Sequence, residues 1–216
     1  MRLQSLSIGY NDSAPVASAM DAELRSGQFC CLLGRNGTGK STLLRTIAGL
    51  LPPLSGCVER PERVALVLTQ VPDLQRTTVR EMVAYGRLGS TGLLGRLHAE
   101  DYEAADRAIL QVGISALAPR LLNTLSDGER QKTMIARAIA QEAPLLLLDE
   151  PSAFLDYPSR RELMLLLQSL AHDHGKCILL STHDVELATQ SADLLWLLKE
   201  RSLKTITPQD FRPEEL

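Results

Sequence analysis

The stretch Gly34-Arg35-Asn36-Gly37-Thr38-Gly39-Lys40-Ser41-Thr42 decides the fold of this chain. It fits the pattern G-x-x-x-x-G-K-[ST], follows the apolar run Phe29–Leu33 and opens a helical pattern over Lys40–Leu50, which is the expected context of a phosphate-binding loop. The glycines let the backbone curl so that several N–H groups point inward, and the helix N-terminus adds partial positive charge. Lys40 supplies a full charge for the terminal phosphates, and the Ser41 hydroxyl is a candidate Mg²⁺ ligand. We therefore expect this loop to bind a nucleoside triphosphate, in preference to the alternative of a chance glycine-rich turn.

Short aliphatic runs alternate with helical patterns along most of the chain. Several runs are continuously apolar, which suits strands buried on both faces of a parallel sheet. The strand-like runs are Phe29–Leu33, Val64–Leu68, Leu145–Leu148, Cys177–Leu180 and Leu194–Leu198, and the helical patterns are Lys40–Leu50, Thr78–Leu88, Glu100–Val112, Gly128–Gln141, Ser159–His172 and Val185–Ser191. From about Gln70 to Gln141 helix follows helix without a convincing strand. The pattern predicts a single α/β domain, with a P-loop NTPase core of residues 1–70 and 142–216 and an inserted helical subdomain at about 71–141.

Two carboxylates follow the buried run Leu145–Leu148. Asp149 and Glu150 stand where that strand should end, in the same chain as the phosphate-binding loop. An acidic pair alone often caps a helix or lies in a solvated turn. Beside a P-loop, we expect Asp149 to hold Mg²⁺ and Glu150 to polarise the water that attacks the γ-phosphate.

Composition excludes several classes of protein. The chain has 216 residues, of which 44% are hydrophobic and 23% charged, so it is neither disordered, fibrous nor a disulfide-stapled miniprotein. A net charge of −3 gives no reason to expect a nucleic-acid partner. The longest apolar runs fall far short of the roughly 20 residues that span a bilayer, and the N-terminus lacks a signal-peptide pattern. The cysteines, Cys30, Cys31, Cys57 and Cys177, predict buried thiols in a reducing compartment.

The pentapeptide Leu125-Ser126-Asp127-Gly128-Glu129 separates this chain from other P-loop proteins. It stands directly before a helical pattern and about twenty residues ahead of the acidic strand. At this point the chain resembles the ATP-binding subunits of ABC transporters, whose signature is usually written L-S-G-G-Q. The resemblance runs from Leu3 to about Glu200 through several ordered motifs.

The resemblance implies roles for further residues. Tyr10, after Gly9, matches the aromatic that stacks on adenine in this family. Gln70 matches the glutamine that reaches Mg²⁺ and the attacking water. The segment Ser152–Asp156 resembles the loop that crosses to a partner subunit. His183 matches the switch histidine on the γ-phosphate.

The resemblance also implies a homodimer. Two chains would face head to tail, so that Ser126 and Gly128 of each complete the MgATP site of the other. Three residues depart from the family pattern: Asp127 replaces a glycine, Glu129 a glutamine and Ala153 a serine. These departures affect the expected closure of the dimer more than the chemistry.

The subclass that the chain most resembles is that of the iron-siderophore, haem and cobalamin uptake ATPases. The resemblance rests on the stretches Thr78–Arg87 and Gly92–Leu97 and on Ser126-Asp127-Gly128-Glu129-Arg130-Gln131-Lys132. It implies a cytoplasmic ATPase on the inner face of the membrane, a separate permease docked on the helical subdomain, and indirect work with a substrate-binding protein. Leu93, Leu94 and Leu97 either contact that permease or pack inside the subdomain.

Other classes of P-loop protein fit less well. Gly37-Thr38-Gly39 has no third glycine after it, which excludes Rossmann-type dinucleotide binding. A kinase or GTPase would not account for the signature, and no guanine-reading Asn-Lys-x-Asp sequence is present. A soluble ABC ATPase of DNA repair or translation, and another ABC transporter subclass, remain alternatives.

Overall fold

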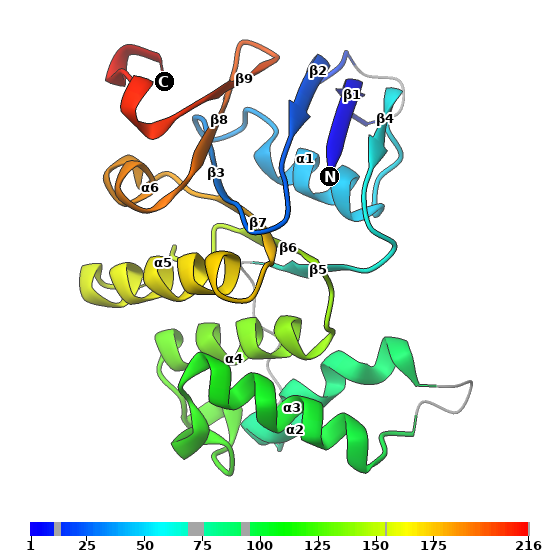
Figure 1. Cartoon of the computed structure of the whole chain (residues 1–216), viewed down its shortest axis with the longest axis vertical. Coiled ribbons are helices and arrows are strands. Elements are labelled where there is room, and N and C mark those ends of the chain that lie inside the picture. Colours follow the sequence, from blue (N-terminus) through cyan, green and yellow to red (C-terminus); the bar gives the residue numbers. More distant parts are fainter. Residues whose placement is uncertain (11–13, 69–75, 92–95, 154, 216) are drawn as a thin grey trace.

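A parallel sheet forms the centre of the molecule. The structure, a computed structural model, describes residues 1–10, 14–68, 76–91, 96–153 and 155–215. In these residues a six-stranded sheet has the order β5-β6-β7-β3-β8-β9 (Figure 1). The strands are β3 (Phe29–Leu33), β5 (Val64–Val67), β6 (Leu145–Asp149), β7 (Cys177–Ser181), β8 (Leu194–Lys199) and β9 (Ser202–Ile206). All neighbours are parallel except β8 and β9, which confirms the α/β fold predicted from the continuous apolar runs.

A second, antiparallel sheet covers one face of the first. It consists of β1 (Arg2–Ile8), β2 (Ala17–Glu23) and β4 (Ser55–Glu59) in the order β2-β1-β4. Helix α1 (Lys40–Ala48) packs with these strands against the side chains of Leu32, Leu147 and Trp196 in the central sheet. The sequence patterns did not predict β2, β4 or β9.

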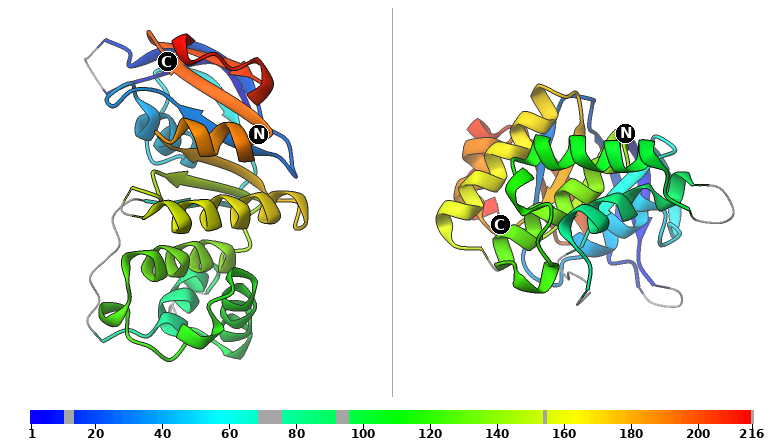
Figure 2. Two further views of the ribbon diagram at one scale, coloured as in Figure 1. Left: turned by 90° about the vertical axis from the view of Figure 1, so that its left-hand side faces the viewer. Right: turned by 90° about the horizontal axis from the view of Figure 1, so that it is seen from below.

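Helices α5 (Tyr157–His172) and α6 (Val185–Ser191) pack on the other face of the central sheet. Helices α2 (Val79–Ala84), α3 (Ala99–Val112) and α4 (Asp127–Ala140) form a separate group, in which α4 contacts the edge strand β5. Figure 2 shows α2, α3 and α4 gathered at one end of the molecule, with α5 between them and the antiparallel sheet. One continuous core runs from β6 through α5 into this group, which we call the helical lobe. Among the described residues, no helix combines the length and the hydrophobicity that crossing a membrane requires.

Reciprocal capping hydrogen bonds stabilise the N-termini of α2 and α4 in the helical lobe. Thr78 accepts a hydrogen bond from Glu81 N–H while the Glu81 carboxylate accepts one from Thr78 N–H, and Ser126 and Glu129 repeat the arrangement at α4. The pattern Thr78–Leu88 predicted one helix, but α2 ends at Ala84 and a 3₁₀ helix, Tyr85–Ser90, follows. Within it the backbone of Gly86 lies so close to α4 that a Cβ would collide with the Arg137 carbonyl oxygen.

Three of the four cysteines are buried, as expected, and one is not. Cys30, Cys31 and Cys177 are buried in the central sheet, and loss of solvation raises the pKa of each thiol. Cys57 is exposed, because β4 lies at the edge of the antiparallel sheet with most of its side chains in solvent.

Candidate functional site

The loops that follow three neighbouring strands meet at one edge of the central sheet. The register of the parallel strands pairs Ser181 of β7 with Leu32 of β3 on one side and with Asp149 of β6 on the other. The phosphate-binding loop, the acidic pair and the segment that contains His183 therefore start side by side. In open α/β sheets, ligands bind outside these carboxyl ends.

The phosphate-binding loop has the backbone conformation that its glycines permit. Gly37 has φ 81° and Gly39 has φ 106°, both in the left-handed region, and a Cβ on Gly39 would collide with the Val16 side chain. Lys40 opens α1, and its side chain is only 5% exposed. Its Nζ donates to the carbonyl oxygens of Gly34 at 2.8 Å and of Arg35 at 3.3 Å. The loop thus holds an ammonium group at its own centre.

Two hydroxyl groups from distant parts of the chain converge on one carboxylate oxygen. Asp149 Oδ1 accepts hydrogen bonds from Ser41 Oγ at 3.1 Å and from Ser181 Oγ at 2.8 Å. The Asp149 residue is 6% exposed. Carboxylate and hydroxyl oxygens are the hard ligands that Mg²⁺ prefers, so Ser41 and Asp149 fit a magnesium site as a donor set.

Glu150 has an unusual backbone conformation for a non-glycine residue. Its φ is 47°, in the left-handed region, which costs about 1–2 kcal/mol. Glu150 N–H donates to Ser181 Oγ at 3.0 Å and to the Ser181 carbonyl oxygen at 3.2 Å. Glu150 Oε1 lies 3.5 Å from Lys40 Nζ. Strain of this kind persists where the surroundings hold it, and it is concentrated at functional sites.

These groups line one cavity of about 390 Å³. Its lining comprises Tyr10, Val16, Asn36, Gly37, Gly39, Lys40, Ser41, Thr42, Asp149 and Glu150. The Tyr10 residue is 49% exposed and lies at the open side of this cavity. The structure therefore brings a ring, an ammonium group, hydroxyl groups and two carboxylates around one hollow.

Other residues expected at the site lie elsewhere or outside the described part. His183 follows β7 and is exposed, but it does not line this cavity. Gln70 lies outside the described residues, as do Leu93 and Leu94, whereas Leu97 packs against the core of the helical lobe. Arg35 and Thr38 line a separate hollow beside Leu198–Glu200.

Ser126 and Gly128 belong to the helical lobe. Ser126 is the exposed N-cap of α4, and a Cβ on Gly128 would lie 3.6 Å from Leu155 Cδ2, so this end of α4 faces the start of α5 in its own chain. Neither residue lines the cavity at Lys40.

Ser181 is a site residue that sequence reasoning missed. It is fully buried, and its hydroxyl bridges the Asp149 carboxylate and the Glu150 backbone. A signal was present, because Ser181 is the polar end of the apolar run Cys177–Leu180, just as Asp149 ends Leu145–Leu148.

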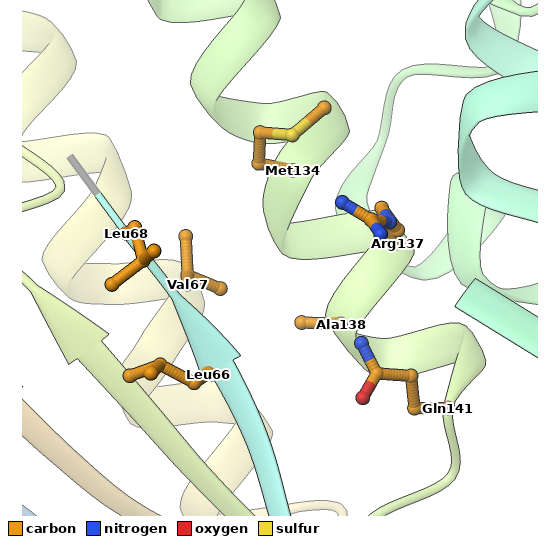
Figure 3. Close-up of a pocket in the computed structure, with 7 residues that line it drawn as sticks. All are labelled: Leu66, Val67, Leu68, Met134, Arg137, Ala138 and Gln141. Atoms are coloured by element: carbon orange, nitrogen blue, oxygen red, sulfur yellow. The ribbon is translucent and has the colours of Figure 1, made fainter. Parts of the chain in front are cut away.

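A second cavity of about 210 Å³ lies between β5 and α4 (Figure 3). Its lining comes from β5 and the residue after it, Leu66, Val67 and Leu68, and from α4 and the residue after it, Met134, Arg137, Ala138 and Gln141. None of its described lining residues belongs to the predicted nucleotide site, and the cavity marks the junction of the central sheet and the helical lobe.

Comparison with known proteins places the chain in a family. The family model described as ABC transporter matches residues 17–153. The ferric enterobactin transport ATP-binding protein FepC of Escherichia coli is 35% identical over 93% of this chain and 78% of its own length. An aliphatic sulfonates import ATP-binding protein of Paraburkholderia xenovorans is 36% identical, again over 93% and 78%.

Solved structures agree with this result. A transporter described as of the metal-chelate type, in an inward-facing conformation, superimposes with a TM-score of 0.90 at 28% identity, over 97% of this chain and 83% of the other. A dimeric bacterial ABC transporter cassette gives a TM-score of 0.79 over 97% and 99% of the two chains, and its 23% identity supports the fold alone. The chain therefore belongs to the ABC transporter family, in which it is an ATP-binding subunit, an ATPase that drives transport.

Proposed function

We propose that this chain hydrolyses MgATP to drive the import of a metal chelate, such as iron-siderophore, haem or cobalamin, through a separate permease. The observation that carries the ATPase part is that Ser41 and Asp149 line one cavity with the Lys40–Glu150 pair, while the buried Ser181 hydroxyl holds the Asp149 carboxylate from behind. The relative that transports ferric enterobactin and the metal-chelate type transporter support the substrate class.

The phosphate-binding loop would neutralise the charge of the nucleotide. The Lys40 ammonium group contacts the carbonyl oxygens of Gly34 and Arg35 and the Glu150 carboxylate. Phosphate oxygens of a bound nucleotide can take the place of these oxygen atoms and accept hydrogen bonds from the same N–H groups. The inward amides of the loop and the start of α1 add positive potential. Tyr10 would stack on adenine at the open side of the cavity.

Ser41 and Asp149, with Gln70, would hold Mg²⁺. When bound, this ion neutralises charge that develops on the phosphates. The role of Ser181 is to fix the carboxylate, because its hydroxyl donates to the same Oδ1 that accepts from Ser41.

Glu150 would accept a proton from the attacking water. Its backbone is held by two hydrogen bonds from its N–H to Ser181, and its carboxylate is 28% exposed, so it has both a fixed direction and access to solvent. His183, which follows the neighbouring strand β7, and Gln70 would sense the γ-phosphate and the water.

Two copies of the chain would form the working unit. Ser126 and Gly128 start a 14-residue helix in the helical lobe and do not line the cavity at Lys40, so a head-to-tail partner is needed to bring them there. ATP would then join the two copies, and hydrolysis would let them part. Asp127, exposed at the first position of α4, adds negative charge at this contact.

The permease would dock on the helical lobe, and the complex would lie on the inner face of the cell membrane. A substrate-binding protein would act through the permease, and no nucleic acid is involved. Support comes from the relatives, whose names describe transport or import ATP-binding proteins.

Replacement of the proposed base tests the chemistry. We expect Glu150→Gln to slow ATP hydrolysis several hundred-fold or more, consistent with loss of a general base. In MgATP this variant should sediment as a dimer. Glu59→Gln, which changes an exposed carboxylate of β4, is the control and should hydrolyse ATP at the wild-type rate. Normal hydrolysis by Glu150→Gln would disprove the role of Glu150.

Two further measurements test the partners. Ser126→Arg should abolish hydrolysis while each monomer still binds ATP, and retained hydrolysis would exclude a shared site.

Uptake of a radioactive ferric siderophore into vesicles that contain the chain and its co-purified permease tests the substrate. Uptake of a sulfonate instead, or of neither compound, would disprove the metal-chelate proposal and leave the ATPase assignment unchanged.

A further inference from the structure

An ion pair joins the start of α5 to the start of α6. Arg160 Nη1 donates to Asp184 Oδ2 at 3.0 Å. The side chains are 30% and 13% exposed, so the pair is partly shielded from solvent. Asp184 follows His183 directly in the sequence, and Arg160 lies in the first turn of α5, four residues after Asp156.

Asp184 fixes the segment after β7 through three bonds. Its Oδ1 accepts from Leu187 N–H at 3.1 Å, which caps α6, while its Oδ2 accepts from Arg160. Its own N–H donates to Thr182 Oγ1 at 3.0 Å. Because Thr182 and Asp184 are the neighbours of His183, these bonds restrain the backbone on both sides of that histidine.

Arg160 is also hydrogen-bonded to the segment that precedes α5. Arg160 N–H donates to the Asp156 carbonyl oxygen at 2.9 Å, and Asp156 Oδ1 accepts from Ser159 N–H at 3.0 Å. The positive charge of Arg160 contributes to lowering the pKa of Asp156, after the hydrogen bonds from Ser159. Asp156 is the last residue of the loop expected to cross to a partner subunit.

We propose that Arg160 is a positioning residue for ATP hydrolysis, which acts through Asp184 on the backbone that carries His183. The guanidinium group bonds Asp184 through Nη1, and its Nε–H is buried without a hydrogen-bond partner among the described residues. The ion pair therefore anchors the guanidinium between two helix starts. The inference rests on the proposed function, because it assumes that His183 contacts the γ-phosphate.

Removal of the anchor should affect turnover more than binding. A misplacement of about 1 Å costs up to about 100-fold in rate, and the Leu187 and Thr182 bonds of Asp184 remain, so we expect a smaller loss. Arg160→Gln should lower kcat for ATP about 10-fold and leave KM and the stoichiometry of bound nucleotide within about 2-fold. Arg160→Lys keeps the positive charge, so its kcat should recover about half of the 10-fold loss on a logarithmic scale, which leaves it about 3-fold below the wild type.

Asp184, which pairs with Arg160, and a second Arg–Asp ion pair elsewhere in the chain provide the controls. Asp184→Asn keeps a capping oxygen but loses the charge, so it should lower kcat about as much as Arg160→Gln, and the double variant should be no worse than either one. Arg80→Gln breaks an Arg–Asp pair with Asp106 in the helical lobe and should leave kcat unchanged. If Arg160→Gln does not fold, Asp184→Asn decides by the same criteria.

The histidine itself separates this inference from the function on which it depends. In a His183→Ala background, Arg160→Gln should cause no further loss of kcat, whereas a purely structural role would lower the activity again. Wild-type kcat in Arg160→Gln, together with impaired His183→Ala, would overturn this inference alone. Full hydrolysis by His183→Ala would overturn both the inference and the proposed role of His183.

Discussion

Removal of the Ser181 hydroxyl should weaken the fold and the magnesium site together. In Ser181→Ala, Asp149 Oδ1 loses its 2.8 Å donor and Glu150 N–H loses its 3.0 Å acceptor, although it keeps the bond to the Ser181 carbonyl oxygen. A hydrogen bond to a buried charge contributes about 1.5–3 kcal/mol, and a neutral one about 1 kcal/mol. Since the side chain is fully buried, water does not replace the hydroxyl, and we expect a loss of about 3 kcal/mol.

Calorimetry can measure this loss. For a chain of 216 residues, about 3 kcal/mol corresponds to a fall in Tm of about 6–12 °C. MgATP affinity should fall about 10-fold, as is usual when a metal-binding carboxylate loses its orienting partner. Ser202→Ala removes an exposed hydroxyl at the first residue of β9 and should leave both quantities unchanged. A Tm within about 2 °C of that control would refute the bridging role of Ser181.

Three other predictions concern the cavity edge and the helical lobe. Tyr10→Ala should weaken MgATP binding about 5-fold in calorimetric titration, because a stacked ring contributes about 1 kcal/mol; unchanged affinity would exclude stacking. Hydrogen bonds from Thr78 lower the pKa of Glu81 in the folded state. The ionised Glu81 carboxylate therefore stabilises the fold at pH values above the pKa of an unfolded glutamate, about 4.3, and this stabilisation is lost as the pH falls through the lower pKa of the folded state. The urea midpoint of the wild type should thus exceed that of Glu81→Gln at pH 7 and converge with it near pH 3, and a constant difference would contradict this. Gly86→Ala should lower the free energy of unfolding in urea by about 2 kcal/mol, because the added Cβ collides with the Arg137 carbonyl oxygen. Gly89→Ala, where a Cβ meets open space, should lower it far less. Equal losses of stability in the two variants would contradict the clash.

The central sheet could be predicted from the sequence because its strands are buried on both faces. Beside a P-loop, continuous apolar runs such as Phe29–Leu33 and Leu145–Leu148 are typical of parallel strands, and the structure forms strands over both. The outer strands gave no such signal. In β4 most side chains are exposed, and β2 alternates irregularly between buried and exposed positions, so neither shows the pattern of a parallel strand.

The site could be predicted only in part, because local motifs do not show which side chains meet. The P-loop and the acidic pair identified Ser41 and Asp149, and parallel strand ends made their contact reasonable. The sequence did not reveal that Ser181 bonds the same oxygen, since a lone serine at a strand end is common. The left-handed backbone of Glu150 was also unforeseen, because it depends on hydrogen bonds to a neighbouring strand.

The contact between Ser41 and Asp149 joins positions 108 residues apart, and Ser181 lies a further 32 residues along the chain. During synthesis the ribosome must therefore release the P-loop, the whole helical lobe and β7 before the three side chains can meet. Contacts of such long range form slowly, because loop closure costs entropy before the contact repays it. A nascent chain that ends before β7 carries the complete phosphate-binding loop but only a fragment of the pocket, so nucleotide cannot assist its folding until β7 has been synthesised.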